Sequence, residues 1–199
     1  MPLATFRFLA RRSAIDRVPA PAEWATSDLV HRRLWVECER PQLAATRVLD
    51  IIAADPNVVV PTEVLQFHKT AGNRGRLAVG DRYLIRMAGP WDGPMSVAAR
   101  DEHHIRLQSS LGNPQQGRID FLVQDEDGRL RIEIASRYRP ASRAFRALTR
   151  SLPLIERMEI HTAAHILEMA AQLAGARPPQ RIRLQTTPRR PIRLARDLG

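Results

Sequence analysis

The chain has 199 residues, which suits one domain of about 130–150 residues with extensions, or at most two small domains. Hydrophobic residues make up 44% of the sequence and charged residues 26%, so a wholly disordered chain and a collagen-like chain are excluded. The formal net charge is +10, and the absence of any run of about 18 apolar residues excludes a membrane-spanning helix.

Residues 1–30 form an amino-terminal arm in which no element is predicted, because prolines interrupt its short apolar fragments. Arg7 and Arg11 divide the apolar residues of the arm into pieces too short for a signal peptide. The only cysteine, Cys38, has no partner for an internal disulfide. We therefore expect a cytoplasmic protein.

A strand and a helix are the first predicted elements. Leu34–Cys38 is typical of a short strand, and apolar residues at helical spacing predict a helix from Pro41 to Ile52. The helix is expected to end at Asp55, because the proline that follows disfavours helical backbone at the residue before it. Residues 58–79 are expected to be irregular or to form a short strand.

Alternation of apolar and polar residues predicts a sheet in the middle of the chain. The alternating segments are residues 82–87, 104–108, 118–124 and 129–137. Gly89–Pro94 and Asp125–Gly128 are typical of turns, and connections this short require antiparallel neighbours. We expect a five-stranded antiparallel meander.

A long helix follows the predicted sheet. Apolar residues from Ile155 to Leu173 recur at spacings of 3 and 4, which places them on one face of a helix. This helix is expected to begin near Pro153 and to end near Gly175. The sequence thus predicts an α+β helix-grip domain over residues 31–176, in which a curved antiparallel sheet wraps around a long C-terminal α-helix.

Three segments of the predicted sheet resemble a known family. They read Ala-Val-Gly-Asp-Arg-Tyr at 78–83, Arg-Met-Ala-Gly-Pro-Trp-Asp-Gly-Pro at 86–94 and Gly-Arg-Ile-Asp-Phe at 117–121. With these motifs the chain resembles the domain-of-unknown-function 1990 family of bacterial and plant proteins, over roughly residues 42–175. That family is similar in fold to the START lipid-transfer and birch-pollen-allergen superfamily. The resemblance therefore implies a helix-grip domain with a hydrophobic pocket, and it implies neither an established reaction nor catalytic residues.

The inner face of the sheet and the facing side of the long helix are expected to form the wall of such a pocket. The candidate ligand-binding residues are Tyr83, Ile85, Met87, His103, Ile105, Leu107, Phe121, Ile132, Ile134, Met158, His161 and Ile166. Methionines and a tyrosine hydroxyl make an adaptable wall with one hydrogen-bonding group, which suits a lipid, sterol or polyketide-like molecule. The alternative is that the same side chains form a solid core.

Two pairs of histidines are candidates for other chemistry. His161 and His165 have the spacing of a zinc-protease helix, but Thr162 stands where that motif has its catalytic glutamate. His103 and His104 are consecutive strand residues, so their side chains point to opposite faces of the sheet. We therefore predict no metal site and no cofactor.

Residues 177–199 concentrate the positive charge, with seven arginines and one acidic residue. Their prolines and few apolar residues predict a disordered basic tail. Two roles are open for this tail: contact with nucleic acid or an anionic membrane, and improved solubility.

The leading hypothesis is a non-enzymatic module that binds a small hydrophobic ligand, or that has lost this capacity and serves in protein interaction. The alternative is a cyclase- or hydrolase-like enzyme that uses the same cavity. Tyr83, His103 or His161 would then act as acid–base groups.

Overall fold

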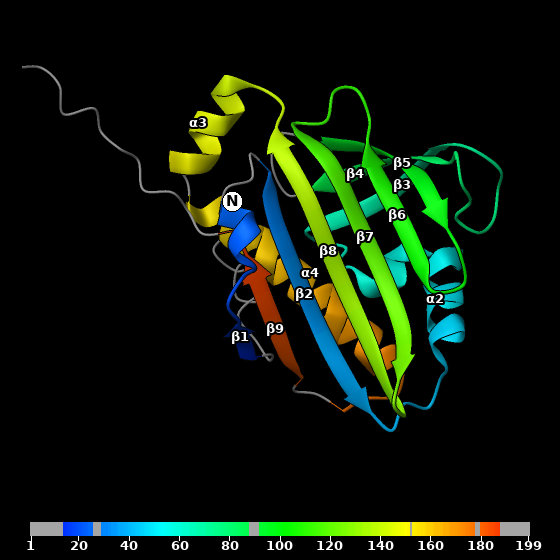
Figure 1. Cartoon of the computed structure of the whole chain (residues 1–199). Coiled ribbons are helices and arrows are strands. Elements are labelled where there is room, and N and C mark those ends of the chain that lie inside the picture. The colour runs from blue at the N-terminus through cyan, green and yellow to red at the C-terminus, as the bar shows by residue number, and fades with distance from the viewer. Residues whose placement is uncertain (1–13, 26–28, 88–91, 152, 178–179, 188–199) are drawn as a thin grey trace, which may run out of the picture.

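The structure is a computed structural model that describes residues 14–25, 29–87, 92–151, 153–177 and 180–187 (Figure 1). Within these residues nine strands form one curved sheet in the order β1-β9-β2-β8-β7-β6-β5-β4-β3. The strands are β1 (Ala14–Arg17), β2 (Val30–Glu39), β3 (Leu65–Ala71), β4 (Arg82–Met87), β5 (Asp92–Arg100), β6 (His104–Ser109), β7 (Gln115–Glu126), β8 (Arg129–Pro140) and β9 (Arg181–Thr186).

Strands β3 to β8 form the predicted antiparallel meander, with six strands among the described residues where five were predicted. β4, β6, β7 and β8 match the four alternating segments, whereas β5 begins within the predicted turn Gly89–Pro94; the remaining strand, β3, lies in the segment 58–79. Its residues alternate between half-buried and exposed, so its pattern is weak, as is common for an edge strand. Gly89–Trp91, part of a predicted turn, lies outside the described residues.

Strand β9 corrects the prediction that residues 177–199 are disordered. Ile182 and Leu184 are buried and alternate with exposed arginines, a pattern that the surrounding prolines and arginines obscured. β9 pairs antiparallel with β2 but parallel with β1, so the sheet is mixed rather than purely antiparallel. The sheet therefore extends beyond residues 31–176 on both sides. Residues 188–199 lie outside the described residues.

The helices of the described residues are α2 (Ala45–Ala54), α3 (Arg143–Ser151) and α4 (Pro153–Leu173), with the short 3-10 helices η1 (Ala22–Ala25) and η2 (Pro56–Val59). α4 is the predicted long helix, although β9 follows it. α2 ends before Asp55 as predicted, but it begins later than Pro41. The segment before it is held against the end of α4, where the Gln42 backbone N–H donates to the Ala174 carbonyl at 2.7 Å. No helix in the described part of the chain is long and apolar enough to cross a membrane.

The core lies between the inner face of the sheet and the helices. On β2, Leu34, Val36 and Cys38 point inward and are almost fully buried. α4 runs along β2 and β8 on this face, and α2 packs against β7 (Figure 1). Small side chains on α4 allow the helix to lie close to the sheet. The buried alanines of α4 and its carboxyl end are Ala164, Ala170, Ala171 and Ala174.

Candidate ligand-binding cavity

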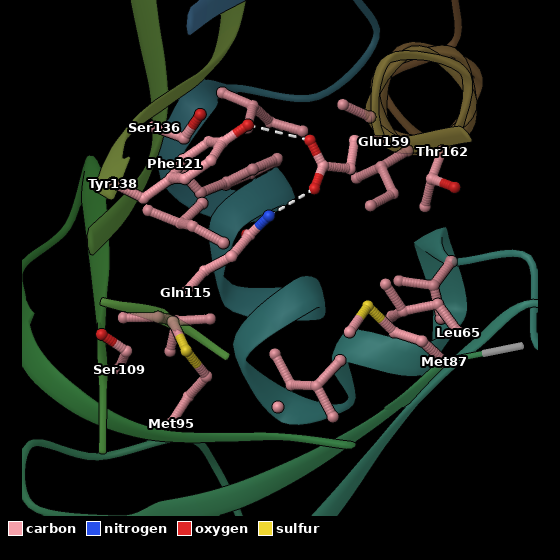
Figure 2. Close-up of a pocket in the computed structure, with 18 of the residues that line it drawn as sticks. Leu65, Met87, Met95, Ser109, Gln115, Phe121, Ser136, Tyr138, Glu159 and Thr162 are labelled. Atoms are coloured by element: carbon pink, nitrogen blue, oxygen red, sulfur yellow. Dashed lines mark hydrogen bonds between the residues drawn. The ribbon is translucent and has the colours of Figure 1, made fainter. Parts of the chain in front are cut away.

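A cavity of about 260 Å³ lies between the inner face of the sheet and α4 (Figure 2). Its wall is formed by inward-facing side chains of β2 to β8, by one face of α4, by Phe145 of α3, and by η2 with the segment that follows it. Most of these side chains are apolar. The volume lies just below the range of small-molecule pockets, which is about 300–1,000 Å³.

Eight of the predicted ligand-binding residues line this cavity. They are Ile85, Met87, Ile105, Leu107, Phe121, Ile134, Met158 and Ile166. Alternation along the strands and the stripe on α4 direct these side chains to the same space. Their contact with a ligand stays a prediction.

Two further predicted residues point inward but lie in the packed core instead. Ile132 is fully buried beside its cross-strand neighbours Val36 and Val123. Tyr83 is also buried, with its ring edge against Phe67. The expectation that Ile132 and Tyr83 line the cavity is therefore wrong. Alternation determines which face of the sheet a residue occupies, but it does not determine how far the helix lies from it.

The two predicted histidines lie outside the cavity as well. The Nδ1 atom of His103 is 3.1 Å from the carbonyl oxygen of Val123, and the His103 side chain is 40% exposed. His161 is exposed on α4, and His165 is half-buried, which lowers the pKa of its imidazole. No three His, Cys, Asp or Glu side chains among the described residues are grouped so that they could hold a metal ion. Of the three acid–base groups considered for an enzyme, none lines the cavity.

Sequence reasoning missed a polar cluster at one end of the cavity (Figure 2). The Glu159 carboxylate on α4 accepts three hydrogen bonds. Arg32 Nη1 donates to Glu159 Oε2 at 2.8 Å, and the Tyr138 hydroxyl donates to the same oxygen at 2.9 Å. Gln115 Nε2 donates to Glu159 Oε1 at 2.5 Å. Arg32 Nη2 is also 3.9 Å from Glu156 Oε1, and we refer to these five residues as the Glu159 cluster.

The cluster residues occupy inward positions of their elements. Arg32 has the parity of the buried residues that follow it on β2, and Tyr138 has the parity of the cavity-lining residues of β8. Glu159 lies one turn from Ile155 on the apolar stripe of α4. Gly117 of β7 lies opposite Tyr138, and a Cβ atom at Gly117 would collide with the β8 backbone. In the sequence, the cluster could have been found from polar residues at inward positions of otherwise apolar strand and helix faces.

Burial and charge determine the protonation of the cluster. Burial alone would lower the pKa of Arg32, but Tyr138 and Glu159 outweigh it and raise the pKa, so the guanidinium stays charged. Burial and then the negative charge of Glu159 raise the pKa of Tyr138. The phenol therefore keeps the proton that it donates. The cavity thus combines an apolar wall with a charged, hydrogen-bonded end.

Ser109 and Asn113 of the wall are hydrogen-bonded to neighbouring backbone, while Ser136 and Thr162 place further hydroxyl groups in the wall. The Ser109 hydroxyl donates to the Gly117 carbonyl at 2.9 Å and accepts from the Gly117 N–H at 2.6 Å. Asn113 Nδ2 donates to the Pro94 carbonyl at 3.1 Å. The Glu159 cluster is thus the main charged feature of the wall, beside the hydroxyl groups of Ser136 and Thr162.

Comparison with known proteins supports the fold. No family model matches the sequence, and no curated protein matches it. Solved structures do match. Hypothetical protein jhp0584 from Helicobacter pylori has a TM-score of 0.52 at 13% identity, covering 71% of this chain and 86% of that protein. Norcoclaurine synthase from Thalictrum flavum has a TM-score of 0.50 at 15% identity, covering 73% of this chain and 84% of that protein.

The fold is a helix-grip fold. This confirms the predicted α+β class with a curved sheet against a long helix. At identities this low the likeness shows the fold alone. The resemblance to the domain-of-unknown-function 1990 family is not confirmed, because no family model matches.

Proposed function

We propose that this chain binds a small, largely apolar molecule in the cavity between the sheet and α4. The observation that carries the proposal is the cavity itself, about 260 Å³ in volume, with a mainly apolar wall and the Glu159 cluster at one end. A concave apolar space with a few convergent polar groups is the usual form of a small-molecule site.

The energetic cost of such a space supports a binding role. Protein interiors are close-packed, and residual void costs roughly 24 cal/mol per Å³. A wholly enclosed empty space of about 260 Å³ would therefore cost on the order of 6 kcal/mol, and the partial opening of this cavity to solvent reduces that cost. The net stability of a domain is only about 5–15 kcal/mol. A defect of this size favours a use for the space over the alternative of a solid core.

Membership of the domain-of-unknown-function 1990 family and a cytoplasmic location are part of this proposal. The family membership rests on the motifs at residues 78–83, 86–94 and 117–121. The location rests on the single, buried cysteine, which has no partner for an internal disulfide.

The alternative functions have less support. A cyclase- or hydrolase-like activity stays a prediction, and its candidate acid–base groups are not in the cavity wall. Contact with nucleic acid or an anionic membrane through residues 177–199 also stays a prediction. Two arginines of that segment already have acidic partners in the sheet: Arg181 Nε is 3.3 Å from Asp16 Oδ2, and Arg183 Nη1 is 3.0 Å from Glu37 Oε1.

Calorimetric titration with octanol tests the proposal. The native protein should bind one equivalent with a negative heat-capacity change, which is the robust sign of apolar burial. Ala163 of α4 lies in the cavity wall, so Ala163→Phe should fill the space and weaken binding at least about tenfold. Ala54→Phe is the matched control, because Ala54 is exposed at the end of α2 and outside the wall. Equal affinity in both variants would overturn the proposal.

A further inference from the structure

We propose that the outer face of the sheet carries a second ligand site, which binds a phosphate group. Its residues are Arg118, Arg137 and Arg139 with the neighbouring Gln108 and Gln116, and we call them the outer arginine cluster. The cluster lies on the face of the sheet opposite the cavity, so this site does not depend on the proposed function.

Strand pairing brings the cluster together. Arg118 of β7 lies directly opposite Arg137 of β8, and Gln116 lies directly opposite Arg139. Gln108 of β6 lies opposite Arg118 on its other side. Directly opposite residues have Cβ atoms about 4.5–5.5 Å apart, and residues two positions apart on one strand are about 7 Å apart. The three guanidinium groups can therefore reach one small anion.

The side chains of the cluster point away from the cavity. Tyr138 points into the cavity, so its neighbours Arg137 and Arg139 on β8 point outward. Arg118 borders the cavity as well, but its Nε atom is 3.4 Å from Oδ2 of Asp120, whose carboxylate is hydrogen-bonded to two outward side chains of β6. Figure 1 shows α2 and α4 on the inner face of the sheet, so neither helix covers the cluster.

Positive charge is in excess at the cluster. Arg137 and Arg139 are exposed and form no ion pair within the described part of the chain. Arg118 has the Asp120 carboxylate nearby, but its buried Nε atom forms no hydrogen bond with any described residue. Burial and then the positive charge of Arg137 lower the pKa of His31, which lies opposite Arg137 on β2. The charge of Arg137 therefore acts on its surroundings without an acidic partner.

The same face of the sheet pairs other arginines with carboxylates. Arg33 and Arg131, farther along the sheet, both donate hydrogen bonds to Glu133. At the cluster, Arg118 and Arg137 instead stand directly opposite each other. Like charges in this position destabilise an antiparallel pair of strands. A bound anion would relieve that repulsion.

A phosphate group fits the cluster better than a carboxylate does. A phosphate ester has three strong acceptor oxygens and a charge of about −1.5 to −2 at pH 7. Guanidinium groups bind phosphate through paired, charge-assisted hydrogen bonds. Arg139 also lines a shallow hollow with Gln108, Ser110 and Gln116, whose amide and hydroxyl groups can donate further hydrogen bonds. Three cations and several neutral donors thus surround one place on the surface.

Two sources can supply the phosphate group: a soluble phosphomonoester and the headgroup of an anionic lipid. The Leu111 side chain is 98% exposed and lines the same hollow. At a membrane surface this side chain would contact lipid chains, whereas a soluble ester has no need of it. Nucleic acid is disfavoured, because the cluster has no aromatic side chain on which bases could stack.

Calorimetric titration of the full chain with glycerol 3-phosphate at low salt tests the site. We expect one equivalent to bind, and acetate to bind at least about tenfold more weakly. Arg137→Gln and Arg139→Gln, made separately, should each weaken phosphate binding at least about fivefold. Arg47→Gln is the matched control, because it removes the same charge from an exposed residue of α2, on the inner side of the sheet. Octanol affinity should stay within about twofold in all three variants, so failure of this site and failure of the proposed function are distinguishable.

Sedimentation with lipid vesicles distinguishes the two sources. Binding to phosphatidylcholine vesicles that contain phosphatidic acid, but not to phosphatidylcholine alone, assigns the phosphate to a lipid headgroup. Leu111→Ser should then weaken vesicle binding and leave the affinity for glycerol 3-phosphate unchanged. Binding of glycerol 3-phosphate without vesicle binding assigns the site to a soluble phosphomonoester.

Three results would overturn the inference. The first is that neither glycerol 3-phosphate nor the vesicles with phosphatidic acid bind the native protein. The second is that acetate binds as tightly as glycerol 3-phosphate. The third is that Arg47→Gln weakens phosphate binding as much as Arg137→Gln does, because the effect would then come from the net charge of the whole protein.

Discussion

The same sheet and the same helix form a solid core at one end of the molecule and a cavity at the other. Ile132 and Ile134 are two residues apart on β8 and share its inner face, yet Ile132 is fully packed and Ile134 borders the cavity. On α4, Ala171 is fully buried, whereas Ala163 faces the cavity. We call these two regions the packed end and the cavity end.

Residue type alone therefore does not determine whether an inward-facing residue belongs to the core or to the cavity wall. At the packed end, consecutive small residues such as Ala170 and Ala171 let α4 approach the sheet. At the cavity end, Met158 and Glu159 stand on the same helix and face the cavity. The spacing between layers therefore changes along one helix, and it changes within two residues of one strand.

Truncating the two isoleucines should give the largest difference in stability between the packed end and the cavity end. Ile132→Ala should lower the free energy of unfolding by about 3–4 kcal/mol, because it opens a void among close-packed neighbours. Ile134→Ala should cost about 1–2 kcal/mol, because its side chain already borders free space. Urea denaturation of both variants measures the difference. Equal losses would mean that the two ends are packed alike.

Enlarging the two alanines should give opposite signs. Ala171→Leu should destabilise by about 2–3 kcal/mol, since overpacking forces the helix away from the sheet. Ala163→Leu should be neutral or should stabilise by up to about 1 kcal/mol, because the new side chain fills existing space. Thermal unfolding of the pair shows the sign, and a destabilised Ala163→Leu would argue against the cavity.

The smallest expected effect is on the pH dependence of stability, and it concerns Glu133, which lies on the outer face of the sheet and not in the cavity wall. Burial raises the pKa of Glu133, but hydrogen bonds from Arg33 and Arg131 outweigh it and hold the pKa below the ordinary 4.5. Because the folded-state pKa is lowered, this stabilisation is complete above about pH 4.5 and is lost as the pH falls through the folded value. Glu133→Gln should therefore reduce the loss of stability between pH 5 and pH 3, roughly the range of carboxylate titration.

Octanol affinity supplies the control for this prediction. Glu133 points to the outer face, so Glu133→Gln should leave the affinity unchanged. A variant that keeps the native pH profile, or that loses octanol binding, would contradict the separation of the two faces.

Much of the fold could be predicted from residue periodicity, because burial imposes it directly. The apolar stripe of α4 and the alternation of β4, β6, β7 and β8 each place side chains on the correct face. Strand β9 was missed because its alternation is short and its exposed positions are arginines. The distinction between Ile132 and Ile134 was also missed, since alternation contains no information on layer spacing.

The candidate site could be predicted only in its apolar part. Arg32, Tyr138 and Glu159 are polar residues at inward positions, and a periodicity argument assigns polar residues to solvent. They become compatible with burial only through their mutual hydrogen bonds, which join three distant segments of the chain. Pairing of this kind depends on tertiary structure and has no local signature.

The position of β9 between β2 and β1 has a consequence for the order of assembly during synthesis. The ribosome releases β1 and β2 before β9, yet among the described strands β1 pairs with β9 alone. Until β9 emerges, the outer edge of β2 has unpaired backbone groups of the kind that promote association between chains. Strand β1 is thus synthesised well before β9, the strand with which it pairs.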